Sequence, residues 1–184
     1  MKSHNENKEF KKDVIQWDVE NWYKFISFIE KNGISFQGKN VLELGARDGG
    51  LSLYFALKGA KVVCSDLEGP TENAHILHKK YQIENNITYS SIDATNIPSE
   101  YNNSFDYIIF KSVIGGIGSF NDINAQMKLV NSIHDSLKND GLVIFVDNME
   151  SSGLHKFFRR NFCNWGKRWH YETIEEIHSL FDSF

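Results

Sequence analysis

The chain has 184 residues, of which 41% are hydrophobic and 24% are charged, and its formal net charge is −4. This length supports one domain with one core, and the acidic balance disfavours a general nucleic-acid binder, which is usually basic. No apolar run approaches the roughly 20 residues that span a bilayer, and the polar N-terminus lacks the apolar stretch of a secretory signal. The two cysteines, Cys64 and Cys163, are too few for a disulfide framework, so we expect a cytoplasmic protein.

Residues 1–17 are expected to form a polar N-terminal tail, because residues 1–12 are polar and rich in Lys and Asn. Asp18 can cap a helix that runs to about Lys31, with apolar residues at helical spacing on one face. After Gly33, short apolar segments alternate with helical ones. We expect strands at 41–44, 61–65, 87–92, 105–110 and 141–146, and helices at 51–57, 71–81, 121–137 and 173–181.

The expected strands are mostly continuous apolar runs, which is typical of strands that are covered on both faces. Their alternation with helices predicts an α/β fold, a doubly wound and mainly parallel sheet with helices on both faces and right-handed crossovers. The domain is expected to span residues 18–184. Ligands of such sheets bind beyond the carboxyl ends of the strands, so the residues that follow the strands carry the functional prediction.

The segment after the first strand contains glycines that let the backbone turn and approach a ligand closely. It reads Glu43-Leu44-Gly45-Ala46-Arg47-Asp48-Gly49-Gly50. A dinucleotide fingerprint requires G-x-G-x-x-G, and here Arg47 stands where the middle glycine is needed. The spacing Glu43-x-Gly45-x-Arg47-x-Gly49 instead resembles the first motif of class I S-adenosylmethionine (SAM)-dependent methyltransferases, E/D-x-G-x-G-x-G, and departs from it at Arg47.

Four further segments resemble this family in the family's order. Asp66 ends the second strand, Asp93 follows the third, 105–110 resembles the strand-four signature, and 137–142 resembles the turn before strand five. The resemblance covers about residues 20–150 and implies a Rossmann-like methyltransferase that uses SAM and releases S-adenosylhomocysteine (SAH). It also implies that Asp66 binds the ribose hydroxyls and that Asp93 binds the adenine amino group. The implied cofactor-binding residues are Glu43, Gly45, Ala46, Arg47, Gly49, Asp66, Leu67, Asp93, Ala94 and Lys111.

Other interpretations of these residues stay open. Glu43 can serve a structural ion pair, Asp93 can be a helix cap, and the two motif glycines can serve the turn alone. Asp66 can bind the ribose of a nicotinamide cofactor, since dehydrogenases place an acid at the same strand end. The alternatives to a methyltransferase are therefore a nicotinamide-dependent oxidoreductase and a non-catalytic SAM-binding or interaction domain.

The loop 111–119 follows the fourth strand, where the family brings methyl donor and acceptor together. Its three glycines indicate either a mobile loop that closes over the site or a flexible connector. The loop lacks the N/D-P-P-Y/F signature of methyltransferases that act on adenine or glutamine amino groups. By analogy with the family, we expect a small-molecule, sugar or lipid acceptor and O-methylation.

The segment 154–171 contains five Lys or Arg, two His, six aromatic residues and no acid. Its place after strand five favours an acceptor site in which aromatic residues form walls and cations hold phosphate or carboxylate, whereas a solvated helix face and a membrane-surface helix are the alternatives. His155 is the predicted general base, with an ordinary surface histidine as the alternative. No metal site is predicted. The predicted acceptor residues are Arg159, Arg160, Trp165, Lys167, Arg168, Trp169 and Tyr171.

Members of the family usually carry two more strands after the helix that follows strand five. In this chain residues 173–181 read as that helix, and Phe184 is the last residue. We therefore expect a sheet of five strands in which strand five has an exposed edge. Either the chain is truncated, or another chain, such as a second copy in a homo-oligomer, covers that edge.

Overall fold

The computed structural model describes residues 2–150, 169–182 and 184. Its five strands form one sheet in the order β3-β2-β1-β4-β5, and every neighbouring pair is parallel. The strands are β1 (Asn40–Leu44), β2 (Lys61–Asp66), β3 (Ile87–Ser91), β4 (Phe105–Lys111) and β5 (Leu137–Val146). The predicted parallel, doubly wound sheet is confirmed. Between β1 and β4 the strand order reverses, which is where such sheets bind ligands.

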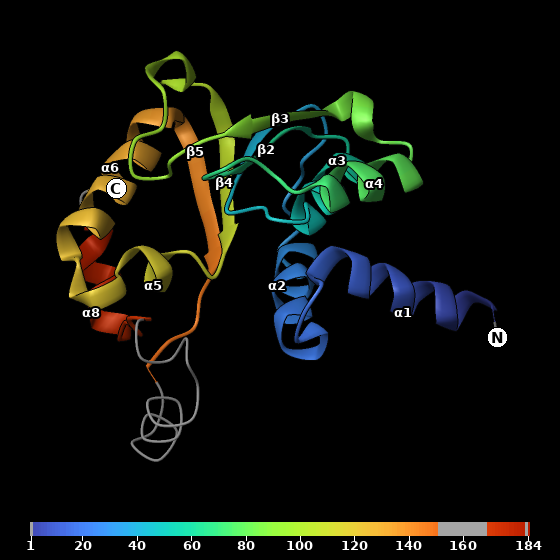
Figure 1. The fold of residues 1–184 in the computed structure, drawn as a ribbon, viewed down its shortest axis with the longest axis horizontal. Coiled ribbons are helices and arrows are strands. Elements are labelled where there is room, and N and C mark those ends of the chain that lie inside the picture. The colour runs from blue at the N-terminus through green and yellow to red at the C-terminus, as the bar shows by residue number, and fades with distance from the viewer. Residues whose placement is uncertain (1, 151–168, 183) are drawn as a thin grey trace.

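Helices cover both faces of this sheet (Figure 1). One side carries α1 (Lys2–Ile15), α2 (Val19–Lys31), α3 (Gly50–Leu57) and α4 (Glu72–Lys80). The other carries α5 (Ile114–Ile117), α6 (Ile123–Ser136) and α8 (Ile174–Leu180). Short 3₁₀ turns at Glu84–Asn86, Ser99–Tyr101 and Ser119–Asn121 complete the described connections.

Two hydrophobic cores lie on the two faces of the sheet. Val41 and Ile109 pack in the core that contains α1, α2 and α3, whereas Leu42 and Ile108 pack in the core that contains α6. Successive residues of a strand point to opposite faces, so both must be apolar when both faces are covered. This arrangement explains why the strands read as continuous apolar runs.

The N-terminal residues do not form the expected polar tail, because most of them form helix α1. Val14 and Ile15 at its end are fully buried in the core with α2 and α3. On its polar side, Lys80 of α4 lies 2.7 Å from both Glu9 and Asp13. A helix with few apolar residues is stabilised mainly by tertiary packing, and these contacts with distant residues cannot be read from residues 1–17 themselves.

One predicted helix cap and the starts of two elements differ from the prediction, whereas the other predicted ends agree to within one residue. Asp18 precedes α2, but its carboxylate accepts hydrogen bonds from the Asn21 side chain at 3.0 and 3.1 Å and does not cap the helix backbone. Helix α6 starts at Ile123, after the predicted start, because the side chain of Asp122 caps it. Strand β5 starts at Leu137, four residues early, with a register shift against β4.

Asp106 of the strand-four motif ties the amino ends of three strands together. Its carboxylate accepts hydrogen bonds from the Asn40 amide at 2.9 Å, from Lys39 at 3.2 Å and from Lys138 at 2.8 Å. Burial raises the pKa of Asp106, but the hydrogen bonds from Lys138, Asn40 and Lys39 outweigh that effect and bring the pKa to about 2. This motif residue therefore stabilises the sheet at the end opposite to the ligand-binding edge.

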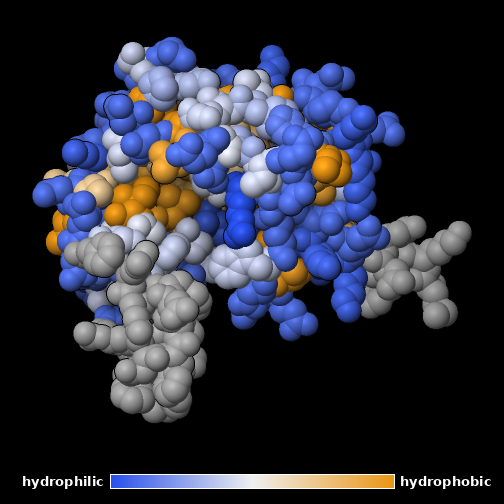
Figure 2. Space-filling model, viewed as in Figure 1, coloured by the Kyte–Doolittle hydropathy of each residue, from blue (hydrophilic) through white to orange (hydrophobic). Residues whose placement is uncertain are grey.

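In the described part of the chain, β5 forms one edge of the sheet, as predicted. Apolar residues gather in the half of the surface where α5, α6 and β5 lie, whereas the half over α1 to α4 is mostly hydrophilic (Figure 2). That a second copy covers this edge stays a prediction. None of the described helices has the length and hydropathy to cross a membrane.

Candidate functional site

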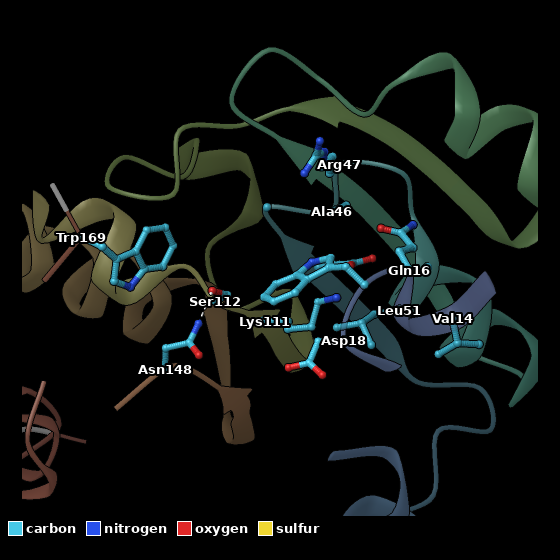
Figure 3. Close-up of a pocket in the computed structure, with 14 residues that line it drawn as sticks. Val14, Gln16, Asp18, Ala46, Arg47, Leu51, Lys111, Ser112, Asn148 and Trp169 are labelled. Atoms are coloured by element: carbon cyan, nitrogen blue, oxygen red, sulfur yellow. Dashed lines mark hydrogen bonds between the residues drawn. The ribbon is translucent and has the colours of Figure 1, made fainter. Parts of the chain in front are cut away.

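A cavity of about 710 Å³ lies at the carboxyl ends of β1 and β4. The α1–α2 junction, the loop after β1, the start of α3 and the end of β4 line most of it. Figure 3 shows Trp169 at one end, Gln16 with Leu51 at the other, and Lys111 between them. The lining residues are Val14, Gln16, Trp17, Asp18, Glu43, Gly45, Ala46, Arg47, Gly50, Leu51, Lys111, Ser112, Asn148 and Trp169.

The loop after β1 has a backbone that only its glycines adopt without strain. Gly45 and Gly49 have φ angles of 67° and 71°, in the left-handed region. A Cβ at Gly45 would lie 2.9 Å from the Val113 side chain, and a Cβ at Gly49 would lie 2.6 Å from the His78 ring. Both conformation and space therefore require glycine at these two positions.

Arg47, which departs from the family motif, keeps the backbone shape that a glycine would give. Its φ angle is 49°, a left-handed conformation that costs a non-glycine residue roughly 1–2 kcal/mol. Its amide N–H donates a hydrogen bond of 2.8 Å to Oδ2 of Asp66, which helps to hold this conformation. The loop thus retains its path, and the side chain of Arg47 becomes part of the cavity wall.

Asp66 lies at the end of β2, beside the glycine loop, as predicted. Its Oδ1 accepts a 2.8 Å hydrogen bond from the amide of Leu67, and its Oδ2 accepts the bond from Arg47. Each carboxylate oxygen has two lone pairs, so both oxygens keep capacity for a further donor such as a ribose hydroxyl. The side chain of Leu67 is exposed next to this carboxylate, and neither residue lines the cavity.

Glu43 is buried at the end of β1 and lines the cavity. Its Oε2 accepts hydrogen bonds from the amide of Ser52, at 2.7 Å, and from the Ser52 hydroxyl. Burial raises the pKa of Glu43 to about 7, while the bonds from Ser52 and the charge of Lys111 act in the opposite direction. Glu43 therefore fixes the start of α3 against β1, in addition to any contact with a ligand.

Asp93 follows the end of β3, where Ser91 is the partner of Asp66 and the amide of Ile92 donates to the Asp66 carbonyl at 2.9 Å. Its Oδ1 accepts hydrogen bonds from the amide and the hydroxyl of Thr95, at 2.9 and 2.8 Å. Asp93 is exposed and Ala94 is half-buried. Asp93 thus closes a turn and caps no helix, because no helix begins at this position. Its binding of adenine stays a prediction.

Lys111 at the end of β4 points into the cavity and connects it to the N-terminal helix. Its ammonium donates a 2.7 Å hydrogen bond to the carbonyl of Ile15 and lies 5.0 Å from the centroid of the Trp17 ring. Burial lowers the pKa of Lys111 to about 8, whereas the neighbouring charge of Glu43 raises it. The cavity therefore contains an ammonium group that loses its proton near pH 8, closer to neutrality than an ordinary lysine.

The glycines after β4 have a packing role that the sequence did not indicate. The segment includes the short helix α5, and Asp147 accepts hydrogen bonds from the amides of Val113 and Ile114 at 2.9 and 2.8 Å. The ring of Trp169 packs on Gly115 and Gly116 so closely that a Cβ at Gly115 would collide with it. The glycines thus bring the predicted acceptor residue Trp169 against the end of β4.

The predicted acceptor residues divide into two groups. Trp169 lines the cavity, and Tyr171 is half-buried outside its lining. The predicted base His155 and the predicted acceptor residues Arg159, Arg160, Trp165, Lys167 and Arg168 lie outside the described residues.

Several cavity residues were not predicted from the sequence. Gln16, Trp17 and Asp18 come from the presumed tail, and Ser112 and Asn148 pair through a 3.2 Å hydrogen bond from the Asn148 amide. The sequence signal for this packing is the apolar pair at 14–15, which is followed by Trp17.

Strained backbone concentrates around the cavity. Of the seven described non-glycine residues with positive φ, four line it, namely Gln16, Asp18, Arg47 and Ser112, with φ between 44° and 72°. Such conformations cost about 1–3 kcal/mol each and tend to persist at functional sites. Among the residues that the structure describes, no group of three or more His, Cys, Asp or Glu side chains is placed to hold a metal ion.

Three solved structures have the same fold at low sequence identity. Phosphoethanolamine N-methyltransferase 2 of Haemonchus contortus, in complex with phosphomonomethylethanolamine and SAH, is 22% identical with a TM-score of 0.65, over 88% of this chain and 36% of that chain. The YcgJ protein of Bacillus subtilis is 19% identical with a TM-score of 0.68, and the match covers 88% of this chain and 67% of that chain. The 1,6-didemethyltoxoflavin-N1-methyltransferase of Burkholderia thailandensis, with 1,6-didemethyltoxoflavin and SAH bound, is 19% identical with a TM-score of 0.62. The match covers 86% of this chain and 64% of that chain.

The chain spans about a third of the length of the nematode enzyme and about two thirds of the other two proteins. Among curated protein sequences, none matches the chain significantly. The sequence profile described as a methyltransferase domain matches residues 17–184, which is most of the chain. The chain therefore belongs to the methyltransferase domain family and has its Rossmann-like fold.

Proposed function

We propose that this protein transfers the methyl group of SAM to a small-molecule acceptor and releases SAH. The observation that carries the proposal is the left-handed Gly45–Gly49 loop at the end of β1, whose backbone is held by Asp66 at the end of the neighbouring strand. The loop borders a cavity of about 710 Å³, which is in the range of small-molecule sites. Two of the proteins with this fold are described with SAH bound, which supports the choice of cofactor.

The residues fit the parts of SAM in a simple order along the strand ends. The turn at Asp93 and Ala94 after β3 would lie at the adenine, and Asp66 and Leu67 after β2 would lie at the ribose, with Asp66 accepting from both hydroxyls. The glycine loop lets the backbone approach the ligand closely. The amino-acid end would then lie in the cavity with Glu43, Ala46, Arg47 and Lys111.

When bound, SAM supplies a methyl group that is already activated on a sulfonium. The protein therefore has to align the acceptor with the reacting carbon and exclude water, and it can accept a proton from the acceptor. Trp17 and Trp169 supply apolar surface to the cavity for this purpose. We keep His155 as the proposed base.

The proposed acceptor is a hydroxyl-bearing small molecule, sugar or lipid, and Arg159, Arg160 and Trp165 are proposed to hold it together with Trp169. Nitrogen is the alternative acceptor atom, and the names of two neighbours with this fold, which are N-methyltransferases, favour it. A cytoplasmic location belongs to the same proposal.

Transfer of a labelled methyl group from SAM to panels of hydroxyl and amine acceptors tests the proposal. Asp66→Ala should weaken SAM binding roughly tenfold or more, because loss of paired hydrogen bonds costs about 1–3 kcal/mol. Asp135→Ala is the matched control, since Asp135 is an exposed carboxylate on α6 that lies outside the site. Label transfer to no acceptor, despite SAM binding, would favour the non-catalytic alternative, and unchanged binding by Asp66→Ala would remove the ribose assignment.

A further inference from the structure

The α1–α2 junction forms a wall of the cavity, and its first part, up to Gln16, precedes the residues that match the family profile. Val14, Gln16, Trp17 and Asp18 line the cavity, whereas the match begins at residue 17. Helix α1 reaches this place by packing on α3: a Cβ at Gly50 would collide with the carbonyl of Val14. The junction therefore contacts the first turn after the glycine loop directly.

Lys111 holds the junction on its other side. Its ammonium bonds to the Ile15 carbonyl at 2.7 Å, and the ring of Trp17 lies against it with 5.0 Å between nitrogen and ring centroid. A cation over the face of a tryptophan is attracted by the ring electrons. The bond to Ile15 and the contact with Trp17 keep the ammonium at the cavity, and both of these partners are neutral. The carboxyl group of Glu43 is the acidic neighbour whose charge acts on Lys111, and its own pKa is raised to about 7 by burial.

The side-chain amide of Gln16 is a second hydrogen-bond donor, and no described residue accepts a hydrogen bond from it. Its Nε2 is buried and has no hydrogen-bond partner, and its backbone is held at a φ angle of 72°. A buried donor without an acceptor destabilises the folded protein, and left-handed backbone at a non-glycine residue adds to this cost. Such a group is explained when a ligand supplies the missing acceptor.

We propose that Gln16 and Lys111 together bind the carboxylate at the amino-acid end of SAM and SAH, an inference that rests on the proposed function. A carboxylate is the ligand group that satisfies one ammonium and one amide donor at once. The adenine and ribose assignments place the nucleoside at the ends of β2 and β3, outside the cavity lining, so the amino-acid end is the part that enters the cavity. The N-terminal helix is then part of the cofactor site.

Calorimetric titration with two ligands tests this inference without measuring turnover. SAH carries the amino-acid carboxylate, and 5′-methylthioadenosine is a related thioether that lacks the amino-acid part. The variants are Gln16→Ala, Gln16→Glu and Gln82→Ala. Gln82 is the matched control, because it is also a glutamine with positive φ, 56°, but is exposed and lies outside the cavity lining.

Gln16→Ala should weaken SAH binding roughly tenfold, as expected for a hydrogen bond to a charged group, and should change 5′-methylthioadenosine binding less than about twofold. Gln16→Glu should weaken SAH binding more, because it places two carboxylates together, and Gln82→Ala should change neither ligand. Equal weakening of both ligands by Gln16→Ala, or equal wild-type affinity for SAH and 5′-methylthioadenosine, would overturn the inference. If the wild type binds neither ligand, the proposed cofactor itself is wrong.

Discussion

Alanine at Gly49 should destabilise the protein more than alanine at Gly33, and the difference measures how tightly His78 holds the glycine loop. Both glycines have left-handed φ angles, 71° and 63°. A Cβ at Gly49 would lie 2.6 Å from Cε1 and 2.7 Å from Nε2 of His78, whereas a Cβ at Gly33 meets nothing within 4 Å. Gly33→Ala therefore carries the backbone cost alone.

The magnitude follows from what holds His78 in place. His78 is fully buried, and its two ring nitrogens lie 2.9 Å from the Tyr89 hydroxyl and 2.8 Å from the Gly49 carbonyl oxygen, so it cannot move aside easily. Left-handed alanine costs roughly 1–2 kcal/mol at either site. Overpacking adds about 1–3 kcal/mol at Gly49. We expect losses of roughly 1–2 kcal/mol for Gly33→Ala and 2–5 kcal/mol for Gly49→Ala.

Urea unfolding followed by circular dichroism gives the free energies of unfolding of both variants. The comparison requires that the free energy falls with urea concentration at the same slope in both. In a His78→Ala background the collision with the ring disappears and only the 3.0 Å approach to Cβ of Ala74 remains, so the extra cost of Gly49→Ala should shrink towards the Gly33→Ala value. Equal losses for Gly49→Ala and Gly33→Ala in the otherwise unchanged protein would refute the claim that His78 packs against this loop.

Two further predictions concern the charges of the site. Because burial lowers the pKa of Lys111 to about 8, SAH affinity should fall as the ammonium loses its proton above that pH. Protonation of Glu43, whose pKa is raised to about 7, acts at lower pH and is separate from this loss. Calorimetric titrations of SAH over a series of pH values should show this fall in the wild type and not in Lys111→Met. The same pH dependence of SAH affinity in both proteins would contradict the role of the charge. Replacing Arg159 and Arg160 together with alanine should leave SAM affinity unchanged and weaken turnover of the acceptor. The loss of turnover should become smaller as the salt concentration rises, because screened charges contribute less. Full turnover in that double variant, with no binding to anionic vesicles, would identify the segment as a solvated face and move the acceptor site towards residues 111–118.

The strands could be predicted because their sequence signal is local. The expected strands at 41–44, 61–65 and 105–110 each differ from the structure by one residue, since runs covered on both faces are apolar and end at polar or glycine residues. The end of β5 was also predicted, but its start was not. Residues 138–140 are Lys, Asn and Asp, which are not typical of a buried strand, yet they belong to β5 where its register against β4 is irregular.

Parts of the site could not be predicted, because they depend on contacts between distant residues. Helix α1 is polar in sequence, and it is placed by its packing on Gly50 and by the pairing of Lys80 with Glu9 and Asp13. The motif residues at β1 and β2 were located correctly at the strand ends. The unsatisfied amide of Gln16 has no sequence signal, since it follows from burial alone.

A thermal-shift measurement with SAM, SAH, NAD and NADP at equal concentrations tests the central claim most directly, because a ligand that binds only the folded protein raises the melting temperature. The account predicts that SAM and SAH raise the melting temperature of the protein and that NAD and NADP leave it unchanged. A rise with NAD or NADP and none with SAM or SAH would contradict the account and support the nicotinamide-dependent alternative.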